Sequence, residues 1–468
     1  MPAQQPTSER ILLITGRLAE GLARQVAQRL SSQFSIEIKV VGISVAALMH
    51  VEWLRRKLTI DGKYDRVVVP GWCQGELDEL TSHYQIPFER GPKELLDLPE
   101  YLTGKQREPV ELNAYDIEIL AEINHAPRLS LAEILAQSKQ YRKSGADLID
   151  LGCIPGETWQ EIAHAVAMLR DEGFRISVDS FDQQEVAQAV TAGAELVLSC
   201  NQSNVGWLKE LPVESVVIPD QTNDLASFHE TIEELSEANR TYRLDPILEP
   251  IGFQFAASLG RYYEVRRRYP DTPMMMGIGN LTEMTEVDSA GANVLLAAIC
   301  QELTIHSVLT TEVINWARSS VQEFDLARKL VKHAIDHKTL PKHVDSQLVM
   351  LRDRKVTELG DEGLRQLAAQ LKDPNYRIFV ERGEIHVMNR DGYWHGSEPF
   401  ELFDQFSQDA KLDASHAFYL GYELSKAMTA LALRKQYRQD QALQWGFLTI
   451  PEVSAHERRR QPKSENQS

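Results

Sequence analysis

Three carboxylates lie at or near the carboxyl ends of apolar segments in this chain of 468 residues. Asp150 lies in "ADLIDLG", Asp179 in "FRISVDS" and Asp245 in "TYRLDP". An unpaired charge in apolar surroundings is costly, so each carboxylate must be paired, hydrogen-bonded or placed in a pocket. An ionised carboxylate accepts two parallel N–H bonds from a planar donor, which suits a heterocycle with an amino-amidine edge. The alternative is structural, because Asp also caps helices and begins turns.

The elements that must position these acids form a regular series. Ser130 and Glu133 begin a capped helical pattern that stops at Gly145, and similar patterns fill most gaps between the apolar segments. Such alternation predicts a closed (β/α)₈ barrel over residues 115–337, with an open doubly wound sheet as the alternative. The eight predicted strands are 119–127, 146–152, 174–180, 194–200, 215–221, 241–248, 273–279 and 306–312.

Nearly every predicted strand delivers an acid or an amide to its carboxyl end, where barrels of this kind carry their active sites. Asn can donate and accept hydrogen bonds at ring positions that a carboxylate leaves unfilled. No His/Glu pair stands at helix spacing, so a bound heterocycle is favoured over a metal cluster. The residues at the strand ends are Asn124, Asp150, Asp179, Asn201, Asp220, Gln221, Asp245, Asn280 and Glu312.

Two smaller modules flank the predicted barrel. Residues 1–110 alternate apolar strands with helical patterns, which predicts a small α/β domain followed by a polar linker over 98–113. Residues 345–450 predict an α+β domain, with hairpin turns at Arg382-Gly383 and Asp391-Gly392 before a long amphipathic helix. The polar tail, 452–468, is predicted to be disordered.

Composition narrows the class of protein. A net charge of −18 argues against a nucleic-acid-binding surface, which needs a basic footprint. The four cysteines form no cluster, so neither a disulfide framework nor a structural zinc site is expected. No apolar run is long enough to span a membrane and the start has no signal peptide, so we expect a soluble, cytoplasmic protein.

The order of five motifs points to a known family. "INHAP", "ADLIDLG", "ISVDS", "SCNQSN" and "LDPILEPIGF" follow one another as in dihydropteroate synthases and their pterin-binding relatives. The chain resembles more closely the dihydropteroate-synthase-like proteins linked to tetrahydromethanopterin synthesis, which share "TGRLAE", "GNLTE" and "TTE". The resemblance implies a transferase of one-carbon metabolism that joins a dihydropterin-methyl diphosphate to an arylamine.

The resemblance also implies roles for single residues. The amino-pyrimidinone edge of the pterin would be bound by Asp179, Asp245 and Asn201. Asp150 lies on the same set of strands and would also belong to the pterin-binding residues. Asn124 would lie near the diphosphate and its Mg²⁺. The methyl-pterin:corrinoid methyltransferases share the barrel and have an Asn after strand seven, which Asn280 matches. This match would make Asn280 a further pterin-binding residue.

Two departures from the synthase pattern leave the reaction open. "GCIPGET" stands where the synthases have Gly-Gly-Glu-Ser-Thr-Arg-Pro, and "GIGNLTE" stands where they have Ser-Arg-Lys. Aminobenzoate as the acceptor is therefore in doubt. A pterin-dependent methyltransferase and a non-catalytic pterin-binding protein remain alternatives to the transferase, and a homodimer is also left open.

Transfer from a diphosphate needs positioning and stabilisation of the leaving group, so the absence of a recognisable nucleophile is no objection. A phosphate site is needed, and barrels often place one after strands seven and eight. Arg318, Ser319 and Ser320 begin the last barrel helix and are predicted to bind phosphate, with His125 and Arg128 as alternative contacts. In the structural alternative, the serines only cap the helix.

Overall fold

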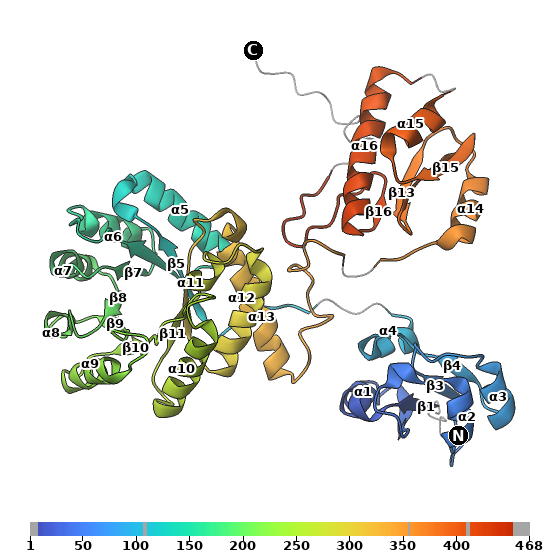
Figure 1. Ribbon diagram of the computed structural model, residues 1–468, viewed down its shortest axis with the longest axis horizontal. Coiled ribbons are helices and arrows are strands. Elements are labelled where there is room, and N and C mark those ends of the chain that lie inside the picture. Colours follow the sequence, from blue (N-terminus) through green and yellow to red (C-terminus); the bar gives the residue numbers. More distant parts are fainter. Residues whose placement is uncertain (1–7, 106–109, 354–355, 409–411, 453–468) are drawn as a thin grey trace, which may run out of the picture. The chain divides into compact units, whose positions relative to one another are not determined.

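The computed structural model describes residues 8–105, 110–353, 356–408 and 412–452, and the chain divides into two compact units, 1–110 and 111–468 (Figure 1). The predicted disordered tail lies outside the described residues, apart from Glu452. The finer division of the second unit at residues 337 and 345 stays a prediction.

The first unit is a parallel sheet with strand order β2-β1-β3-β4, and the predicted N-terminal α/β fold is confirmed. Separate apolar clusters form around Leu12 and Ile14 and around Ile11 and Leu13, because successive residues of β1 point to opposite faces of the sheet. Part of the predicted linker is instead helix α4. The elements are β1 Glu9–Thr15, α1 Glu20–Arg29, β2 Phe34–Val40, α2 Val51–Lys57, β3 Arg66–Val69, α3 Asp78–Tyr84, β4 Phe88–Arg90 and α4 Leu98–Thr103.

The second unit begins with eight parallel strands that close into a barrel, as predicted. The order is β10-β9-β8-β7-β6-β5-β12-β11, and the ring closes where Leu244 N donates to Pro273 O at 2.9 Å. The open doubly wound alternative is therefore wrong. The strands are β5 Glu118–Ile123, β6 Leu148–Gly152, β7 Ile176–Asp179, β8 Leu196–Cys200, β9 Glu214–Val217, β10 Tyr242–Leu244, β11 Met275–Gly277 and β12 Ser307–Thr310.

Helices surround this ring (Figure 1). Helix α5 begins with the predicted capping box of Ser130 and Glu133 and ends at Gly145. The helices of the barrel are α5 Leu131–Ser144, α6 Ile162–Asp171, α7 Gln183–Ala192, α8 Val205–Leu208, α9 Ala226–Glu237, α10 Phe255–Arg268, α11 Gly279–Thr282, α12 Ser289–Glu302 and α13 Ser320–Asp336.

Side-chain alternation along each strand separates two cores. On β5, Ile119, Ala121 and Ile123 belong to the large cluster between strands and helices, whereas Leu120 belongs to the small cluster inside the ring. Since strand side chains alternate with a period of two, residues 118 and 122 share the inward face with Leu120. The inner cluster contains Leu120, Leu148, Leu196, Leu198, Val216 and Met275.

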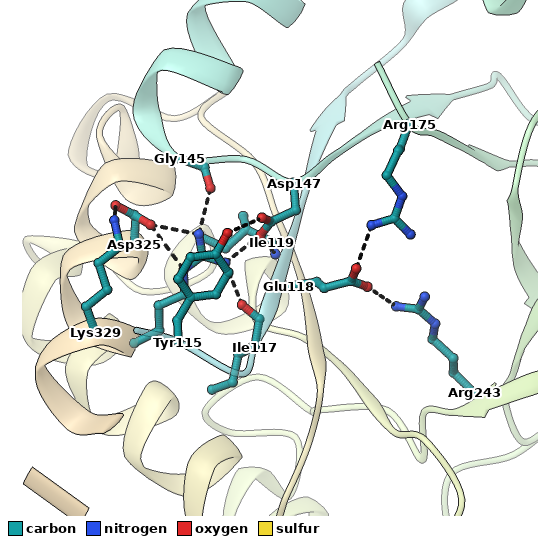
Figure 2. Close-up of polar contacts among 11 residues, drawn as sticks. Tyr115, Ile117, Glu118, Ile119, Gly145, Asp147, Arg175, Arg243, Asp325 and Lys329 are labelled. Atoms are coloured by element: carbon teal, nitrogen blue, oxygen red, sulfur yellow. Dashed lines mark hydrogen bonds and ion pairs between the residues drawn. The ribbon is translucent and has the colours of Figure 1, made fainter. Parts of the chain in front are cut away.

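Below the inner cluster, at the amino ends of the strands, acids and arginines pair with each other. Glu118 accepts from Arg175 at 2.6 Å and from Arg243 at 2.9 Å (Figure 2). Arg243 also donates to Glu214. Although burial acts to raise the pKa of Glu118, hydrogen bonds and attraction from both arginines outweigh it and lower that pKa. At this end of the barrel, the charges of the inward-facing acids are therefore neutralised by arginines of the chain itself.

Arg328 of α13 anchors the last helix to the first two strands. Its side chain is buried, donates to Asp325 at 2.7 Å and to Gly145 O at 2.9 Å, and also donates to Asp147 and Ile117 O. Figure 2 shows these acceptors gathered around the ring of Tyr115. Gly145 is required here, since its φ is +108° and a Cβ would lie 2.5 Å from the Asp325 carboxyl carbon.

The last module is an antiparallel sheet, β15-β14-β13-β16, and its described residues also form helices, which confirms the predicted α+β fold. Arg382 and Gly383 form the first hairpin turn with positive φ, as predicted. The second turn falls one residue earlier than predicted, at Arg390-Asp391, because Gly392 already pairs with Asn389. The elements are α14 Gly360–Gln370, β13 Arg377–Glu381, β14 Glu384–Asn389, β15 Gly392–Gly396, α15 Pro399–Ser407, α16 Ala414–Leu433 and β16 Tyr437–Arg438.

Among the described residues, no helix has the length and apolar character needed to span a membrane.

Replacing Arg328 with Met is expected to destabilise the protein by about 3–5 kcal/mol, because Asp325 and Asp147 would be left without their buried partner. Arg267→Met on the exposed side of α10 is the matched control and should cost little. Urea denaturation of both variants measures the difference. Equal stabilities would show that the Arg328 network does not hold the barrel together.

Candidate functional site

Acidic side chains project inward at the carboxyl ends of the barrel strands, above the apolar inner cluster. Glu122 lies two residues beyond Leu120, Asp150 two beyond Leu148, and both therefore share the inward face of their strands. Glu122 pairs in register with Asp150, and Gly152 with Asp179, so β5, β6 and β7 bring three carboxyls together.

Asp150 is fully buried and only partly satisfied. Ser177 Oγ donates to Asp150 Oδ1 at 2.6 Å, while Oδ2 has no hydrogen-bond partner among the described residues. Burial raises the pKa of Asp150 well above its usual range, and the nearby carboxyls of Asp179 and Glu122 raise it further. This oxygen therefore lacks a hydrogen-bond partner that the described part of the chain does not supply.

Asp179 closes β7, and within the described residues its carboxylate accepts no hydrogen bond and forms no ion pair. Burial raises its pKa to about 6. Like Asp150, this carboxylate keeps its acceptor positions open.

Glu122 was not predicted as a site residue. The carboxyl of Glu122 lies close to Gly152 at the end of β6. If Gly152 carried a side chain, its Cβ would lie only 2.6 Å from Glu122 Oε1. Burial raises the pKa of Glu122 to about 7, with additional contributions from Asp179 and Glu283. The signal in the sequence was the alternation in "ILAEI", which places Glu122 on the same strand face as Leu120.

Asp245 and Asn280 approach each other on the other side of the mouth. Asp245 accepts from Ile247 N at 2.8 Å and from the Tyr262 hydroxyl, and burial raises its pKa to about 6 despite these bonds. Asn280 Nδ2 donates to Leu248 O at 3.0 Å. A Cβ at Gly277 would lie 3.8 Å from both Asp245 Oδ2 and Asn280 Nδ2, so this glycine keeps space between them open.

Other residues at the strand ends have local structural partners. Asn201 Oδ1 accepts from Ser203 N and Oγ, and its pterin-binding role stays a prediction. Asp220 accepts from Gln202 N at 3.3 Å. Glu312 accepts from Val321 N at 3.1 Å at the start of α13, as in the cap alternative, and burial raises its pKa to about 7.

The predicted phosphate-binding residues before and at the start of α13 differ in whether their side chains already have hydrogen-bond partners within the protein. Ser319 donates to Glu323 at 2.8 Å, and the buried Ser320 hydroxyl contacts Thr310 and Asn293. Arg318 is exposed, and its guanidinium has no hydrogen bond or ion pair within the described chain.

The first loop carries Asn124, His125 and Arg128 in a turn and a short 3₁₀ helix directly after β5. His125 and Arg128 are exposed, and none of the three side chains makes a hydrogen bond to the described residues. Because β5 pairs with β12, this loop and the Arg318 loop rise from neighbouring strands. The assignment of these residues to phosphate stays a prediction.

Comparison with known proteins gives two family matches, one in each half of the chain, and one relative that matches most of its length. Residues 9–93 match a family of unknown function, DUF6513, and residues 366–440 match the family PterinBD-DUF4346. An uncharacterised protein of Methanocaldococcus jannaschii is 28% identical, over 92% of this chain and 98% of its own.

Solved structures match about half of the chain. The chain is similar to a Yersinia pestis dihydropteroate synthase in complex with a sulfonamide drug, with 16% identity, a TM-score of 0.39, and coverage of 47% of this chain and 94% of the other. It is also similar to a Xanthomonas albilineans dihydropteroate synthase in complex with 7,8-dihydropteroate, with 17% identity, a TM-score of 0.38, and coverage of 48% and 95%.

Asp179→Asn is expected to stabilise the free protein at neutral pH. The folded-state pKa of Asp179, about 6, lies above the ordinary value of 3.8, so wild-type stability falls as the pH rises between these values. The variant lacks this loss and should gain on the order of 1–3 kcal/mol above pH 6, with the gain vanishing below about pH 4. Denaturation across this pH range, with the exposed Asp171→Asn as control, measures the effect. A gain that does not depend on pH would contradict it.

Proposed function

We propose that the barrel binds a pterin at its mouth and transfers a dihydropterin-methyl group from its diphosphate to an arylamine, as in dihydropteroate synthases. The observation that carries the proposal is a set of carboxyls at the barrel mouth with unfilled hydrogen-bonding positions. Asp150 is fully buried and Asp179 is half-buried, and neither forms an ion pair with any described residue, so a ligand at the mouth can supply the missing partners. The amino and ring N–H groups of a pterin are neutral donors that meet this need.

The order of the sequence motifs supports the pterin assignment, and so does the family match over residues 366–440, whose name refers to pterin. The sequence motifs also resemble those of dihydropteroate-synthase-like proteins linked to tetrahydromethanopterin synthesis. We therefore propose that the reaction belongs to the synthesis of a tetrahydromethanopterin-type pterin.

The reaction needs no nucleophilic side chain. The lone pair of the arylamine nitrogen forms a bond to the pterin methylene carbon while the bond from that carbon to the diphosphate oxygen breaks. Diphosphate leaves with the electron pair, and the proton of the amine is released to water. The protein's part is to orient the ring through Asp179 and Asp245 and to stabilise the leaving charge.

The leaving group needs cations, and the structure leaves two arginines available for it. Arg128 after β5 and Arg318 after β12 extend from loops of neighbouring strands. Ser319 and Ser320 have internal partners, so they contribute less to this site than the arginines. We therefore propose that the diphosphate lies against Arg128 and Arg318, with His125 beside them.

Mg²⁺ can accompany such a diphosphate. Among the described residues, no group of three or more His, Cys, Asp or Glu side chains is arranged to hold a metal ion. Mg²⁺ commonly keeps waters and substrate phosphate oxygens and takes only one or two protein ligands, so the side-chain oxygen of Asn124 fits this role. When bound, the ion would neutralise charge on the diphosphate.

A product assay tests the function against its alternatives. Dihydropterin-methyl diphosphate and an arylamine should give a pterin–arylamine conjugate and free diphosphate. A requirement for a corrinoid and a methyl-pterin would identify a methyltransferase instead. Pterin binding without product from any donor and acceptor pair would identify a binding protein.

Asp179→Asn is expected to lower pterin affinity about tenfold or more, although it stabilises the free protein. The amide replaces an acceptor oxygen with a donor that faces a donor of the ligand, at a cost of about 1–3 kcal/mol. Pterin titration by calorimetry measures the affinity, with Asp171→Asn as the control. Unchanged affinity would remove Asp179 from the site.

Arg318→Ala is expected to weaken binding of the pterin diphosphate by about 1.5–3 kcal/mol and to leave binding of the bare pterin unchanged. The exposed Arg267→Ala on α10 is the matched control. Parallel titrations with the two ligands give the comparison. An equal loss for both ligands would show that Arg318 does not contact the diphosphate.

A further inference from the structure

A cavity of about 650 Å³ lies beside the short strand β16 in the last module, and none of its lining residues belongs to the barrel. One wall comes from the chain before α14, and the other comes from residues 436–446. A volume of this size is typical of sites that bind small molecules. The lining residues are Ser346, Gln347, Val349, Arg352, Asp353, Thr357, Gln436, Tyr437, Arg438, Gln441, Ala442, Gln444 and Gly446.

Hydrogen bonds and an ion pair join the two walls. Asp353 Oδ2 accepts from Gln436 N at 2.7 Å, and the buried Lys435 ammonium lies 3.1 Å from Asp353 Oδ1. Phe447 N donates to Gln347 O at 2.9 Å. The cavity is therefore formed by contacts of the chain itself, and a ligand would not have to order its walls on binding.

Two guanidinium groups give the cavity an excess of positive charge. Arg438 makes no hydrogen bond or ion pair with a side chain of the described residues, and Arg352 donates to the backbone oxygen of Leu433. Asp353 is the one acid among the described lining residues, and Lys435 neutralises it. Although the whole chain has a net charge of −18, this cavity therefore keeps two cations without an acidic partner in the described chain.

The rest of the lining offers uncharged hydrogen-bonding groups. Gln436 Oε1 accepts from Thr357 N at 3.1 Å, which leaves the NH₂ group of this amide as a donor. The side chains of Ser346 and Gln441 make no hydrogen bond to the described residues. Such groups suit a polar molecule that carries hydroxyl groups or ring nitrogens.

We propose that this cavity binds a phosphate monoester of a small polar molecule. A phosphate monoester carries about 1.5 to 2 negative charges at pH 7, which the guanidinium groups of Arg352 and Arg438 would balance. Both guanidiniums can donate two parallel N–H bonds to phosphate oxygens. A single carboxylate would leave one guanidinium without a counter-charge. Inorganic phosphate would leave most of the cavity unfilled, whereas the organic part of a monoester would contact the amides.

The test uses ribose 5-phosphate, ribose and inorganic phosphate as probes, each titrated by calorimetry into the full-length protein at constant ionic strength. Ribose 5-phosphate is expected to bind at least about tenfold more tightly than inorganic phosphate, because its hydroxyl groups add hydrogen bonds to the same ionic contacts. Ribose should give no measurable binding, since it lacks the charge.

Arg438→Gln is expected to weaken binding of ribose 5-phosphate about tenfold or more, because a charge-assisted contact is lost. Arg365→Gln, at an exposed position of α14 outside the cavity lining, is the matched control and makes the same change in net charge. If Arg438→Gln does not fold, Arg352→Gln should give a loss of similar size. Arg318→Ala in the barrel should leave binding of ribose 5-phosphate unchanged.

Three results would overturn the assignment. They are binding of ribose 5-phosphate no tighter than that of inorganic phosphate, equal losses in the cavity variant and the Arg365→Gln control, and a loss of ribose 5-phosphate binding in Arg318→Ala. Arg438→Gln should leave binding of the pterin diphosphate unchanged, so failure of this proposal would not count against the proposed function.

Discussion

The alternation of side chains along the parallel strands decides where the charges of the barrel lie. On β5, Glu118, Leu120 and Glu122 share one face, so an acid stands on each side of the apolar inner cluster. At the amino end, Arg175 and Arg243 neutralise Glu118. At the carboxyl end, no described cation pairs with Glu122, Asp150 or Asp179. The same residue type therefore stabilises the fold at one end and destabilises it at the other, until a ligand supplies donors.

The cost of the open carboxylates must be met elsewhere in the barrel. Burial raises the pKa values of Asp179, Glu122 and Asp245, which means that ionisation of these groups opposes folding above their ordinary pKa range. The Arg328 cluster joins the last helix to the start of β5 and β6, at the opposite end from the mouth. The ion pairs and hydrogen bonds at the amino ends of the strands stabilise the barrel. The carboxylates at the carboxyl ends can therefore remain without partners, as expected for a binding site in a barrel.

Much of this arrangement could be predicted from the sequence, because it depends on short-range pattern. Apolar segments that alternate with helical patterns predicted all eight strands and placed Asp150, Asp179 and Asp245 at the mouth. Glu122 was missed because only the last one or two residues of each strand were considered, although its place on the same strand face as Leu120 was visible. The Arg328 cluster joins residues more than 180 positions apart, and the Ser320 contact with Asn293 crosses between helices. Neither has a local signal, since both depend on how the last helices pack against the ring.

The proposed reaction requires charges of opposite sign to be kept apart around one small mouth. The open acids belong to β5, β6 and β7, whereas Arg128 and Arg318 extend from the loops after β5 and β12. A neutral pterin can bind the acids through its N–H groups, but its diphosphate would be repelled by them and attracted toward the arginines. The electrostatic pattern would therefore orient the substrate, with the ring over the acids and the leaving group toward the cations.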